Sequence, residues 1–349
     1  MSGPSTLFVV DGGPDIGGGH VMRALTLACA LMERGAPVSL LAPPFVAELL
    51  DRFAPAGVGR ILTAFGEPDD LSRAAVEAAA GFRAVVFDHF RLGARAHYRI
   101  AGGRPSLAVD DLADRRLGVD MVLDVGPDRT AQDYKDLVEP GTRLLLGPSW
   151  ALVRPEFAVA RPAALARRAR TDSVGRVLVS LGLTDVGGIT ARVVNRLLPR
   201  LGEAGLDVVL GRAAASLGEM ERLAARDPRV NLHVETDAMA GLCAAADLSV
   251  GAGGSSVWER CAVGLPGVTL VLAENQAPGA RALAAAGAGE VVDIRADDFE
   301  AAFDRAFTGL VRSPERRARM GRAAANLVDG EGAARAADAL FQKVASPPG

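Results

Sequence analysis

The sequence predicts an α/β fold built from two doubly wound, Rossmann-like domains. Its 349 residues exceed what one hydrophobic core usually serves and fit two compact domains. Short β-branched runs alternate with Ala- and Leu-rich stretches of helical period, which is typical of a parallel sheet with crossover helices. The composition, 49% hydrophobic and 23% charged, is that of a globular protein.

The expected strands fall into two series that are separated by a stretch rich in proline and arginine. We expect the first series at 7–10, 38–41, 84–87, 107–109, 121–125 and 144–146. The second series is expected at 177–180, 208–210, 231–234, 248–250, 268–272 and 290–293. Residues 151–173 break the alternation and are interpreted as a linker. The pattern therefore predicts domains over 1–150 and 174–349 that face a shared cleft, with a last helix that could return to the first domain.

Composition and charge indicate which ligands and which cellular location to expect. A net charge of −3 gives no broad positive field, so a surface that follows nucleic acid is not expected. The cysteines, Cys29, Cys243 and Cys261, lack metal-binding spacing and suit a reducing compartment. The first residues do not resemble a signal peptide, and no apolar run approaches the roughly 18 residues that span a bilayer. We expect a soluble, cytoplasmic protein without stable membrane insertion.

The first motif is a glycine-rich turn, DGGPDIGGGHVMR over Asp11–Arg23, between an expected strand and a helix. Glycines at such a turn let the backbone approach a ligand and direct amide groups at negative charge. Gly19 and His20 stand where a Walker A loop needs Lys and Ser or Thr, and the glycine spacing does not fit a dinucleotide loop. The helix dipole disfavours an imidazolium at a helix start, so His20 is a candidate general base. A histidine that caps the helix is the alternative.

The second motif, GAGGSSVWERCAVGLP over Gly251–Pro266, also follows an expected strand and opens a helix. Its amides and hydroxyls indicate a diphosphate site formed without Lys, Arg or metal, by Gly253, Gly254, Ser255 and Ser256. Glu259 lies one turn into the helix, where its carboxylate can accept hydrogen bonds from two ribose hydroxyls. The alternative is a capping box, because Ser256 and Glu259 fit the S-x-x-E pattern, and both roles can coexist.

These two motifs, with AENQ at 273–276, resemble UDP-sugar hydrolases of the PseG type, relatives of the MurG-like GT-B glycosyltransferases. The resemblance covers almost the whole chain, through FDHF at 87–90, VDD at 109–111, DMVLDVGP at 120–127, GPSWALVRPEF at 147–157 and LGLTD at 181–185. It implies a GT-B-like fold with a sugar-binding, catalytic N-terminal domain and a UDP-binding C-terminal domain. It also implies inverting hydrolysis of UDP-2,4-diacetamido-2,4,6-trideoxy-β-L-altropyranose to UDP and free sugar, in pseudaminic acid biosynthesis for flagellin or surface glycosylation.

The resemblance assigns roles to individual residues. His20 would activate the water that attacks the anomeric carbon, and Glu259 would hold the ribose. The expected substrate-binding residues are Asp11, Gly17, Gly19, Arg23, Asp88, His89, Asn275 and Gln276. The expected nucleotide-binding residues are Gly182, Gly253, Gly254, Ser255, Ser256 and Glu259.

The chain departs from the pattern of this family at three positions. The family usually has Arg, Tyr and Gly where this chain has Val9, Phe90 and Leu183, and the last two positions bear on which sugar is recognised. Carboxylates at strand ends lack a fixed spacing with histidine, so neither a metal nor a cofactor is expected. His89 is either a site residue or a structural histidine. Two other functions stay open: transfer of a UDP-linked sugar to a carbohydrate or lipid acceptor, and sugar-nucleotide binding without turnover.

Overall fold

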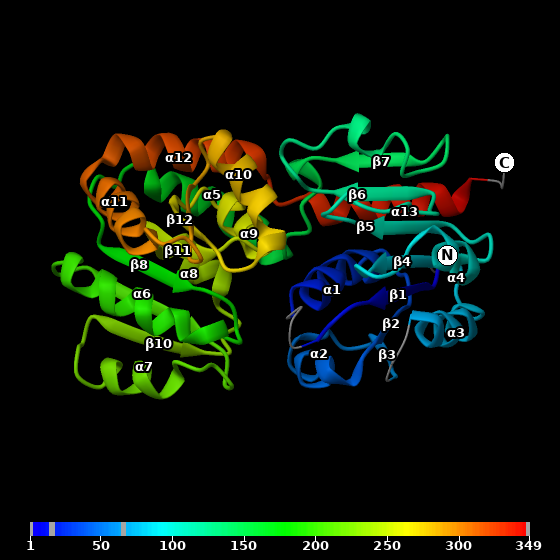
Figure 1. The fold of residues 1–349 in the computed structure, drawn as a ribbon, viewed down its shortest axis with the longest axis horizontal. Coiled ribbons are helices and arrows are strands. Elements are labelled where there is room, and N and C mark those ends of the chain that lie inside the picture. The colour runs from blue at the N-terminus through cyan, green and yellow to red at the C-terminus, as the bar shows by residue number, and fades with distance from the viewer. Residues whose placement is uncertain (1–2, 14–17, 64–67, 347–349) are drawn as a thin grey trace. The chain divides into compact units, whose positions relative to one another are not determined.

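The computed structural model of the protein describes residues 3–13, 18–63 and 68–346. Internal contacts divide the chain into two compact units. Unit 1 comprises Met1–Val153 and Glu331–Gly349, and unit 2 comprises Arg154–Gly330. Each unit is built on one parallel sheet, with the elements labelled in Figure 1.

Unit 1 contains a seven-stranded sheet in the order β3-β2-β1-β4-β5-β6-β7. Its strands are β1 (Thr6–Val10), β2 (Val38–Ala42), β3 (Gly59–Leu62), β4 (Ala84–Asp88), β5 (Ser106–Val109), β6 (Met121–Asp124) and β7 (Arg143–Leu146). Its helices are α1 (Gly19–Met32), α2 (Ala47–Phe53), α3 (Pro68–Ala79), α4 (Ala94–Ala101) and α13 (Gly332–Ala345), with the 3-10 helices η1 (Pro44–Val46), η2 (Ala131–Tyr134) and η3 (Pro148–Trp150). The strand order reverses between β1 and β4, where doubly wound sheets have their binding crevice.

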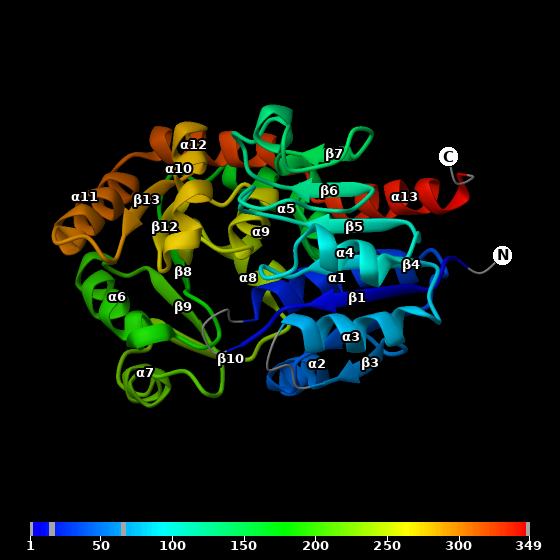
Figure 2. The ribbon, with the colours of Figure 1, turned by 45° about the vertical axis from the view of Figure 1, so that its right-hand side comes forward.

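Alternate side chains of the unit 1 strands pack on opposite faces of the sheet. Phe8 of β1 belongs to a core with α1, α2 and α13, whereas its neighbour Leu7 belongs to a core with α3 and α4. Figure 2 shows α3 and α4 in front of the sheet, with α13 behind it. Both faces are buried because a parallel sheet is covered by its crossover helices.

Unit 2 contains a six-stranded sheet in the order β10-β9-β8-β11-β12-β13. Its strands are β8 (Arg176–Ser180), β9 (Gly205–Leu210), β10 (Val230–Val234), β11 (Leu248–Ala252), β12 (Gly267–Val271) and β13 (Glu290–Asp293). Its helices are α5 (Pro155–Arg168), α6 (Ile189–Leu197), α7 (Leu217–Ala224), α8 (Met239–Ala245), α9 (Ser256–Ala262), α10 (Ala277–Ala285), α11 (Phe299–Arg312) and α12 (Pro314–Leu327), with the 3-10 helices η4 (Val186–Gly188), η5 (Leu198–Arg200) and η6 (Glu274–Gln276). Here the strand order reverses between β8 and β11.

The core of unit 2 contains a row of phenylalanines on α11 that packs against the strands. Phe299, Phe303 and Phe307 recur every four residues on α11, and successive ring centroids lie 6.0 Å apart. This row packs with α6 and with the buried side chains of the strands. The spacing of four places the rings on one face of the helix, which explains why α11 covers the sheet with that face.

The predicted α/β class is confirmed, and every strand except β3 overlaps a range expected from the sequence. β3 lies at an edge of the sheet, and its residues alternate between half-buried and exposed, so its four residues carry little hydrophobic signal. Among the described residues, no helix has the length and apolar character that crossing a membrane requires.

Residues 151–173, which were expected to form a linker, contain α5, and α5 belongs to unit 2. Pro155 occupies the first helical position, where its missing N–H costs nothing, although Pro162 lies in the helix interior. The arginines of this stretch bind helix ends: Arg167 Nε donates to Ala244 O at 3.2 Å, and Arg168 Nη2 donates to Ala246 O at 3.0 Å. These two arginines therefore provide hydrogen-bond donors for carbonyls at the end of α8.

Candidate functional site

The strand reversal in unit 1 brings together residues from β1, α1 and β4. Val10 of β1 is in register with Asp88 at the end of β4, and the Asp11 N–H donates to Asp88 O at 2.8 Å. His20 is the second residue of α1, which begins after the glycine-rich turn. The glycine at position 18 has a packing reason, since a Cβ there would lie 2.8 Å from Leu49 Cδ2. These connections place His20 beside the end of β4.

His20 and Asp88 form a buried hydrogen-bonded pair. His20 Nδ1 bonds to Asp88 Oδ1, and the two residues are only 5% and 1% exposed. A carboxylate can only accept, so Nδ1 carries the hydrogen, and in the neutral imidazole the lone pair is then on Nε2. The ring of Phe90 meets the imidazole edge-on at a centroid distance of 4.4 Å. This arrangement fixes both the tautomer and the orientation of His20, as in catalytic triads.

Arg23 holds the other side of the Asp88 carboxylate. Its Nε donates to Asp88 Oδ2 at 2.6 Å and its Nη2 donates to Asp88 Oδ1 at 2.7 Å, while Nη1 donates to Asp111 Oδ2 at 2.5 Å. Burial raises the pKa of Asp88, but the charge of Arg23 and the hydrogen bonds from Arg23 and His20 outweigh it and hold that pKa well below its usual range. Asp88 is therefore ionised at neutral pH and remains an acceptor for His20.

A second histidine–aspartate contact lies on the same strand ends. His89 Nδ1 is 3.4 Å from Asp11 Oδ2 and accepts from the Arg91 N–H at 3.2 Å. Burial, the largest influence, lowers the pKa of His89 to about 4, so its ring is neutral at pH 7. Asp11 Oδ1 accepts from the Gly12 N–H at 2.9 Å, whereas the buried Oδ2 has no hydrogen-bond partner among the described residues. That oxygen is therefore a buried acceptor with an unused lone pair.

The remaining strand-end carboxylates are engaged with protein groups. The Tyr134 hydroxyl lies 2.8 Å from Asp110 Oδ2 and 2.7 Å from Asp124 Oδ2. Arg115 donates to Asp110 at 2.8 Å, and Arg129 forms an ion pair with Asp124 at 2.6 Å. In the part of the chain that the structure describes, no group of three His, Cys, Asp or Glu side chains could hold a metal ion.

The strand reversal in unit 2 lies beside the second sequence motif. The loop of Gly253, Gly254 and Ser255 follows β11, and α9 begins at Ser256 with Ser255 as its N-cap. No side-chain hydrogen bond caps this helix, so Ser256 and Glu259 do not form the capping box that was the alternative for this motif. The hydroxyls of Ser255 and Ser256 therefore do not cap α9.

Glu259 instead forms a bidentate pair with an arginine at the start of unit 2. Arg154 Nε donates to Glu259 Oε1 at 2.6 Å, and Arg154 Nη2 donates to Oε2 at 3.1 Å. Burial lowers the pKa of Arg154, but the charge of Glu259 outweighs it and raises that pKa above its usual value. The Glu259 side chain stays 14% exposed, so its carboxylate is oriented by Arg154 and is still reachable from solvent.

Three further predicted residues, Gln276, Asn275 and Gly182, follow strands of the same sheet. Gln276 Oε1 accepts from the Leu272 N–H at 3.0 Å, and a Cβ at Gly253 would lie 3.4 Å from the Gln276 side chain. Asn275 is exposed on η6. Gly182, after β8, has φ of +101°, a conformation that side chains rarely adopt. Gln276 and the glycine loop are therefore neighbours.

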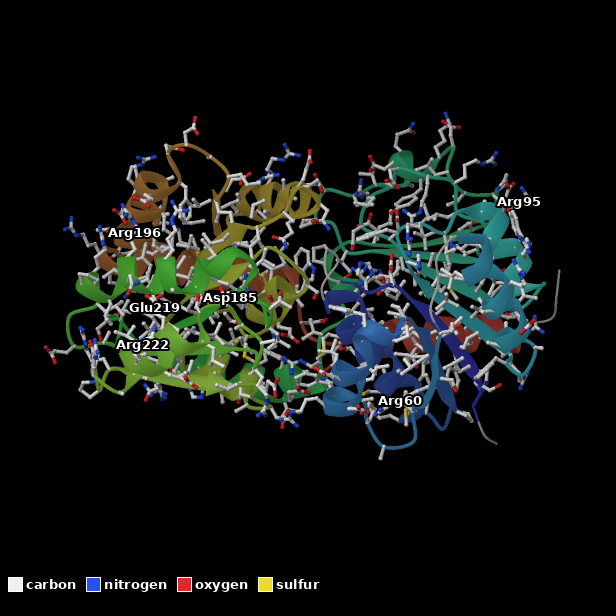
Figure 3. The ribbon with its side chains drawn as sticks, turned by 60° about the horizontal axis from the view of Figure 1, so that its bottom comes forward. Arg60, Arg95, Asp185, Arg196, Glu219 and Arg222 are labelled. Atoms are coloured by element: carbon white, nitrogen blue, oxygen red, sulfur yellow. The ribbon has the colours of Figure 1, made fainter. Side chains whose placement is uncertain are left out.

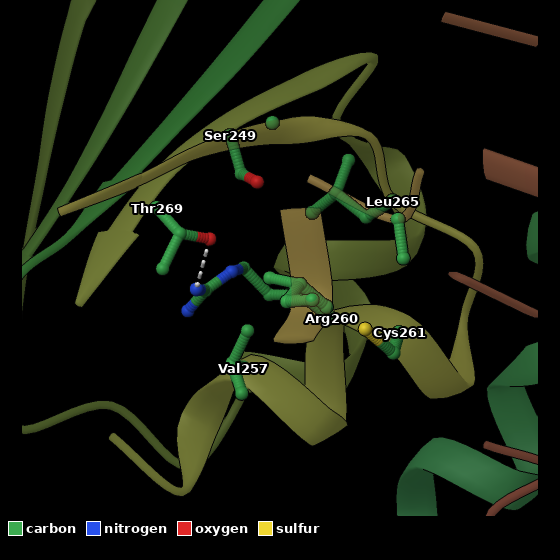
Figure 4. A pocket seen from close by; sticks show the side chains of 9 residues that line it. Ser249, Val257, Arg260, Cys261, Leu265 and Thr269 are labelled. Carbon is green, nitrogen blue, oxygen red and sulfur yellow. Dashed lines mark hydrogen bonds between the residues drawn. The ribbon is translucent and has the colours of Figure 1, made fainter. Parts of the chain in front are cut away.

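Arg260 is a cation that the sequence motif gave no reason to place at this loop. Its guanidinium lies under the loop: Nη2 donates to Ala252 O at 2.9 Å and Nη1 donates to Ser256 Oγ at 3.2 Å. Arg260 is 6% exposed, and burial lowers its pKa. Figure 4 shows its side chain beside Thr269, in a small cavity whose described lining contains no carboxylate. The expectation of a loop without Lys or Arg is therefore wrong, because the chain folds Arg260 back onto it.

Asp185 shapes the other loop at the reversal in unit 2 and was also missed. It ends the LGLTD motif and lies next to α6 in Figure 3. Its backbone has φ of +47°, and its buried carboxylate accepts from the N–H groups of Thr190 and Ser216, both at 2.8 Å. The positive φ and the fully used carboxylate hold the turn between β8 and α6.

The predicted site residues thus fall into two sets. In unit 1 the structure joins His20, Arg23 and Asp88 and places Asp11 with His89; Gly19 is exposed at the start of α1, and Gly17 lies outside the described residues. In unit 2 it groups Gly253, Gly254, Ser255, Ser256 and Gln276 around one loop. The partners Asp111 and Arg154 were missed as site residues, although they lie in the VDD and GPSWALVRPEF motifs.

Known structures share the fold of this chain. MurG of Acinetobacter baumannii superposes with a TM-score of 0.70 at 17% identity, covering 97% of this chain and 100% of MurG. The calicheamicin glycosyltransferase CalG4 gives 0.60 at 18% identity, covering 99% and 100%. LpCGTa in complex with UDP gives 0.65 at 15% identity, also covering 99% and 100%. The chain has the GT-B fold.

Sequence similarity extends less far than this GT-B fold. The spore coat polysaccharide biosynthesis protein SpsG of Bacillus subtilis is 28% identical over 153 residues, which are 43% of this chain and 44% of SpsG. The uncharacterized protein MJ1062 of Methanocaldococcus jannaschii is 26% identical over 155 residues, 44% of this chain and 32% of that protein. The chain therefore matches less than half the length of these curated relatives. No family model matches it.

Proposed function

We propose that the protein cleaves the bond between the anomeric carbon and the diphosphate of a UDP-linked sugar, with His20 as general base. The observation that carries this proposal is the buried His20–Asp88 pair, which uses His20 Nδ1 as a donor and so makes Nε2 the acceptor of the neutral ring. A base of this kind removes the proton from a hydroxyl or water as it attacks carbon. UDP leaves with the electron pair of the broken bond, and the proton remains on His20.

Asp88 and Arg23 act in this proposal as positioning residues. Sequence reasoning proposed them as substrate-binding residues, but their polar atoms are occupied by each other, by His20 and by Asp111. Asp88 stabilises the imidazolium that forms when Nε2 accepts the proton, and Arg23 keeps Asp88 ionised. Asp11 and the neutral ring of His89, which lie together at the strand ends, are proposed to form the sugar-binding side of the site.

Unit 2 is proposed to bind the UDP part. The loop at 253–256 and the loop after β8 meet at the strand reversal, where open α/β sheets bind ligands. Arg260 adds a buried positive charge under the first loop, which favours a diphosphate. Glu259, oriented by Arg154, is proposed to accept from the ribose hydroxyls. The GT-B structures in complex with UDP support this assignment.

Two nucleophiles suit the same base. Transfer to the hydroxyl of a carbohydrate or lipid acceptor is supported by GT-B relatives that match nearly the whole chain and are described as glycosyltransferases. Hydrolysis by water, with UDP-2,4-diacetamido-2,4,6-trideoxy-β-L-altropyranose as substrate, is supported by the PseG-type motifs of the sequence. The comparisons give transfer the stronger support, and the name of SpsG adds polysaccharide biosynthesis as a context.

The test is UDP release from a panel of UDP-sugars that includes the diacetamido-trideoxy-altrose derivative. Purified protein is incubated in EDTA without acceptor and then with candidate hydroxyl acceptors, and UDP and sugar products are followed by NMR. We expect His20→Ala to lower turnover about 10²- to 10⁴-fold, the usual contribution of a general base. His233→Ala, which removes a histidine paired with Asp207 in unit 2, is the matched control.

The outcomes separate the alternatives. Free sugar and UDP without acceptor indicate hydrolysis, whereas a new glycoside formed only with acceptor indicates transfer. UDP binding without any turnover, unaffected by His20→Ala, would contradict the proposal and favour a binding module.

A further inference from the structure

Unit 1 contains a cavity of about 370 Å³ where the start of α4 meets α3 and the segment between β5 and β6. Ser72 of α3 lines it together with the backbone at the start of α4. Five arginine side chains contribute to the lining: Arg91, Arg95, Arg99, Arg115 and Arg116. Such a concentration of guanidinium groups around one cavity costs free energy by mutual repulsion unless anions compensate it.

Among the described side chains, carboxylates compensate only part of this charge. Arg115 Nη1 donates to Asp110 at 2.8 Å and to Asp114 at 3.0 Å. Arg116 Nη2 donates to Glu139 at 3.1 Å. These two arginines therefore have protein partners on the side of the segment that joins β5 to β6.

Arg91 and Arg95 are far less engaged. The Arg91 side chain is 51% exposed, and its ion-pair partner, Asp11 Oδ1, lies 4.0 Å from Nη2. Arg95 is exposed on α4, as Figure 3 shows, and its guanidinium has no ion pair among the described residues. Arg99 has a partner within the protein and is not counted. At least two guanidinium groups at this cavity are thus available to a ligand.

The backbone favours the same kind of ligand. Gly93, Ala94 and Ala96 line the cavity, so the first turn of α4 opens onto it. The Ala94 N–H already donates to Arg116 O at 2.8 Å, so the first-turn donors left without a partner in the helix are the N–H groups of Arg95 and Ala96, where the helix dipole adds positive potential. Guanidinium forks and helix amides together match the oxygens of a phosphate group. A volume of this size also accommodates an organic group attached to the phosphate.

We propose that this arginine cavity binds the phosphate group of a small phosphate ester on unit 1, separately from the UDP site proposed for unit 2. The inference does not depend on the reaction proposed above. Arg115 links the cavity to the histidine cluster, since its Nη2 donates to His89 O at 3.2 Å. A ligand in the cavity would therefore be connected through Arg115 to His89, one of the residues near His20.

The test measures phosphate binding directly, without any UDP-sugar. Wild-type protein is titrated with inorganic phosphate and with glycerol 3-phosphate by calorimetry at constant ionic strength. We expect saturable binding with a Kd of about 1 mM or lower for the ester. Arg91→Gln combined with Arg95→Gln should weaken it by about tenfold or more, because charge-assisted hydrogen bonds are lost. The corresponding pair of lysine substitutions should fall between, since lysine keeps the charge but not the fork.

The matched control removes two arginines of unit 1 that do not line the cavity. Arg60→Gln with Arg83→Gln changes net charge equally, and among the described residues Arg60 bonds to Asp51 and Leu50 O of α2. This control should bind phosphate as the wild type does. Circular dichroism and thermal unfolding establish that all variants fold. An equal loss in the control, or no saturable binding by the wild type, would overturn the proposal.

A second arm identifies the source of the phosphate. Cosedimentation with phosphatidic acid vesicles, compared with neutral phosphatidylcholine vesicles, tests a lipid headgroup. Association that Arg91→Gln with Arg95→Gln abolishes supports a lipid phosphate, and ester binding without vesicle association supports a soluble ligand. UDP release is assayed on the same variants, so failure of phosphate binding and failure of the proposed reaction are seen independently.

Discussion

Asp88→Asn should remove the base from the proposed reaction while keeping the shape of the side chain. Asp88 accepts from His20 Nδ1 and twice from Arg23, at 2.6 and 2.7 Å. An asparagine offers one acceptor oxygen and one NH₂ group in their place. If the NH₂ group faces His20, Nδ1 must accept, the proton moves to Nε2 and the base is lost.

The magnitude follows from the two parts of this network. In a serine protease the same carboxylate-to-amide change lowers kcat about 10⁴-fold through the wrong tautomer, and we expect about 10³- to 10⁴-fold here. Removing one partner of a buried ion pair costs about 3 to 5 kcal/mol. Arg23 keeps Asp111 at 2.5 Å, so we expect a loss of unfolding free energy of about 3 kcal/mol.

The assay is UDP release with the substrate identified from the panel, together with urea unfolding and UDP binding by calorimetry. The loss should appear in kcat, and UDP affinity should be unchanged because Asp88 belongs to unit 1. His20→Gln should cost a similar factor, and the double variant should be no slower than either single variant, because the pair acts as one unit.

Asp111→Asn is the matched control, since Asp111 contacts Nη1 of the same arginine but not His20. It should lower stability with little effect on kcat. A folded Asp88→Asn protein within about threefold of wild-type kcat, or losses that add in the double variant, would refute the role given to the pair.

Three further predictions concern pH and the unit 2 loop. Burial lowers the pKa of His89 to about 4 and of His97 to about 3, from 6.5, so below pH 6.5 the unfolded chain binds protons that the native state does not. The free energy of unfolding should therefore fall by about 2 kcal/mol per histidine between pH 7 and pH 5. Equal urea midpoints at the two pH values would contradict this. Arg260→Met should weaken UDP binding about tenfold but leave uridine binding unchanged. It should not lower the melting temperature, because it removes a buried charge that has no carboxylate partner among the described residues lining its cavity. A parallel loss of uridine binding would indicate that the loop has collapsed. Glu259→Gln should weaken the binding of UDP and of uridine about tenfold but not the binding of pyrophosphate. Arg154→Lys is the control for the orientation of the carboxylate. Unchanged uridine affinity would exclude the ribose contact.

The sequence by itself determined the fold class, nearly all strands and the two motif loops. Hydrophobic periodicity marks buried parallel strands because both faces of each strand are covered. The motifs follow strands, and the carboxyl ends of parallel strands share one edge, so Asp11, Asp88 and the loop at 253–256 could be assigned to ligand-facing edges before any coordinates. The pattern did not predict the edge strand β3, because β3 is half exposed, or the helix α5, because α5 contains prolines.

Only the tertiary structure decided which charged groups meet. His20 and Asp88 are 68 residues apart, and Arg154 and Glu259 are 105 apart. These pairings depend on β4 lying beside β1 and on α5 packing with unit 2, and local periodicity carries no information about either. The return of Arg260 onto its own loop and the arginines around the start of α4 likewise depend on side-chain directions. The physical reason is that a local pattern sets which face of an element is buried, whereas the order and packing of the elements set which neighbour that face meets.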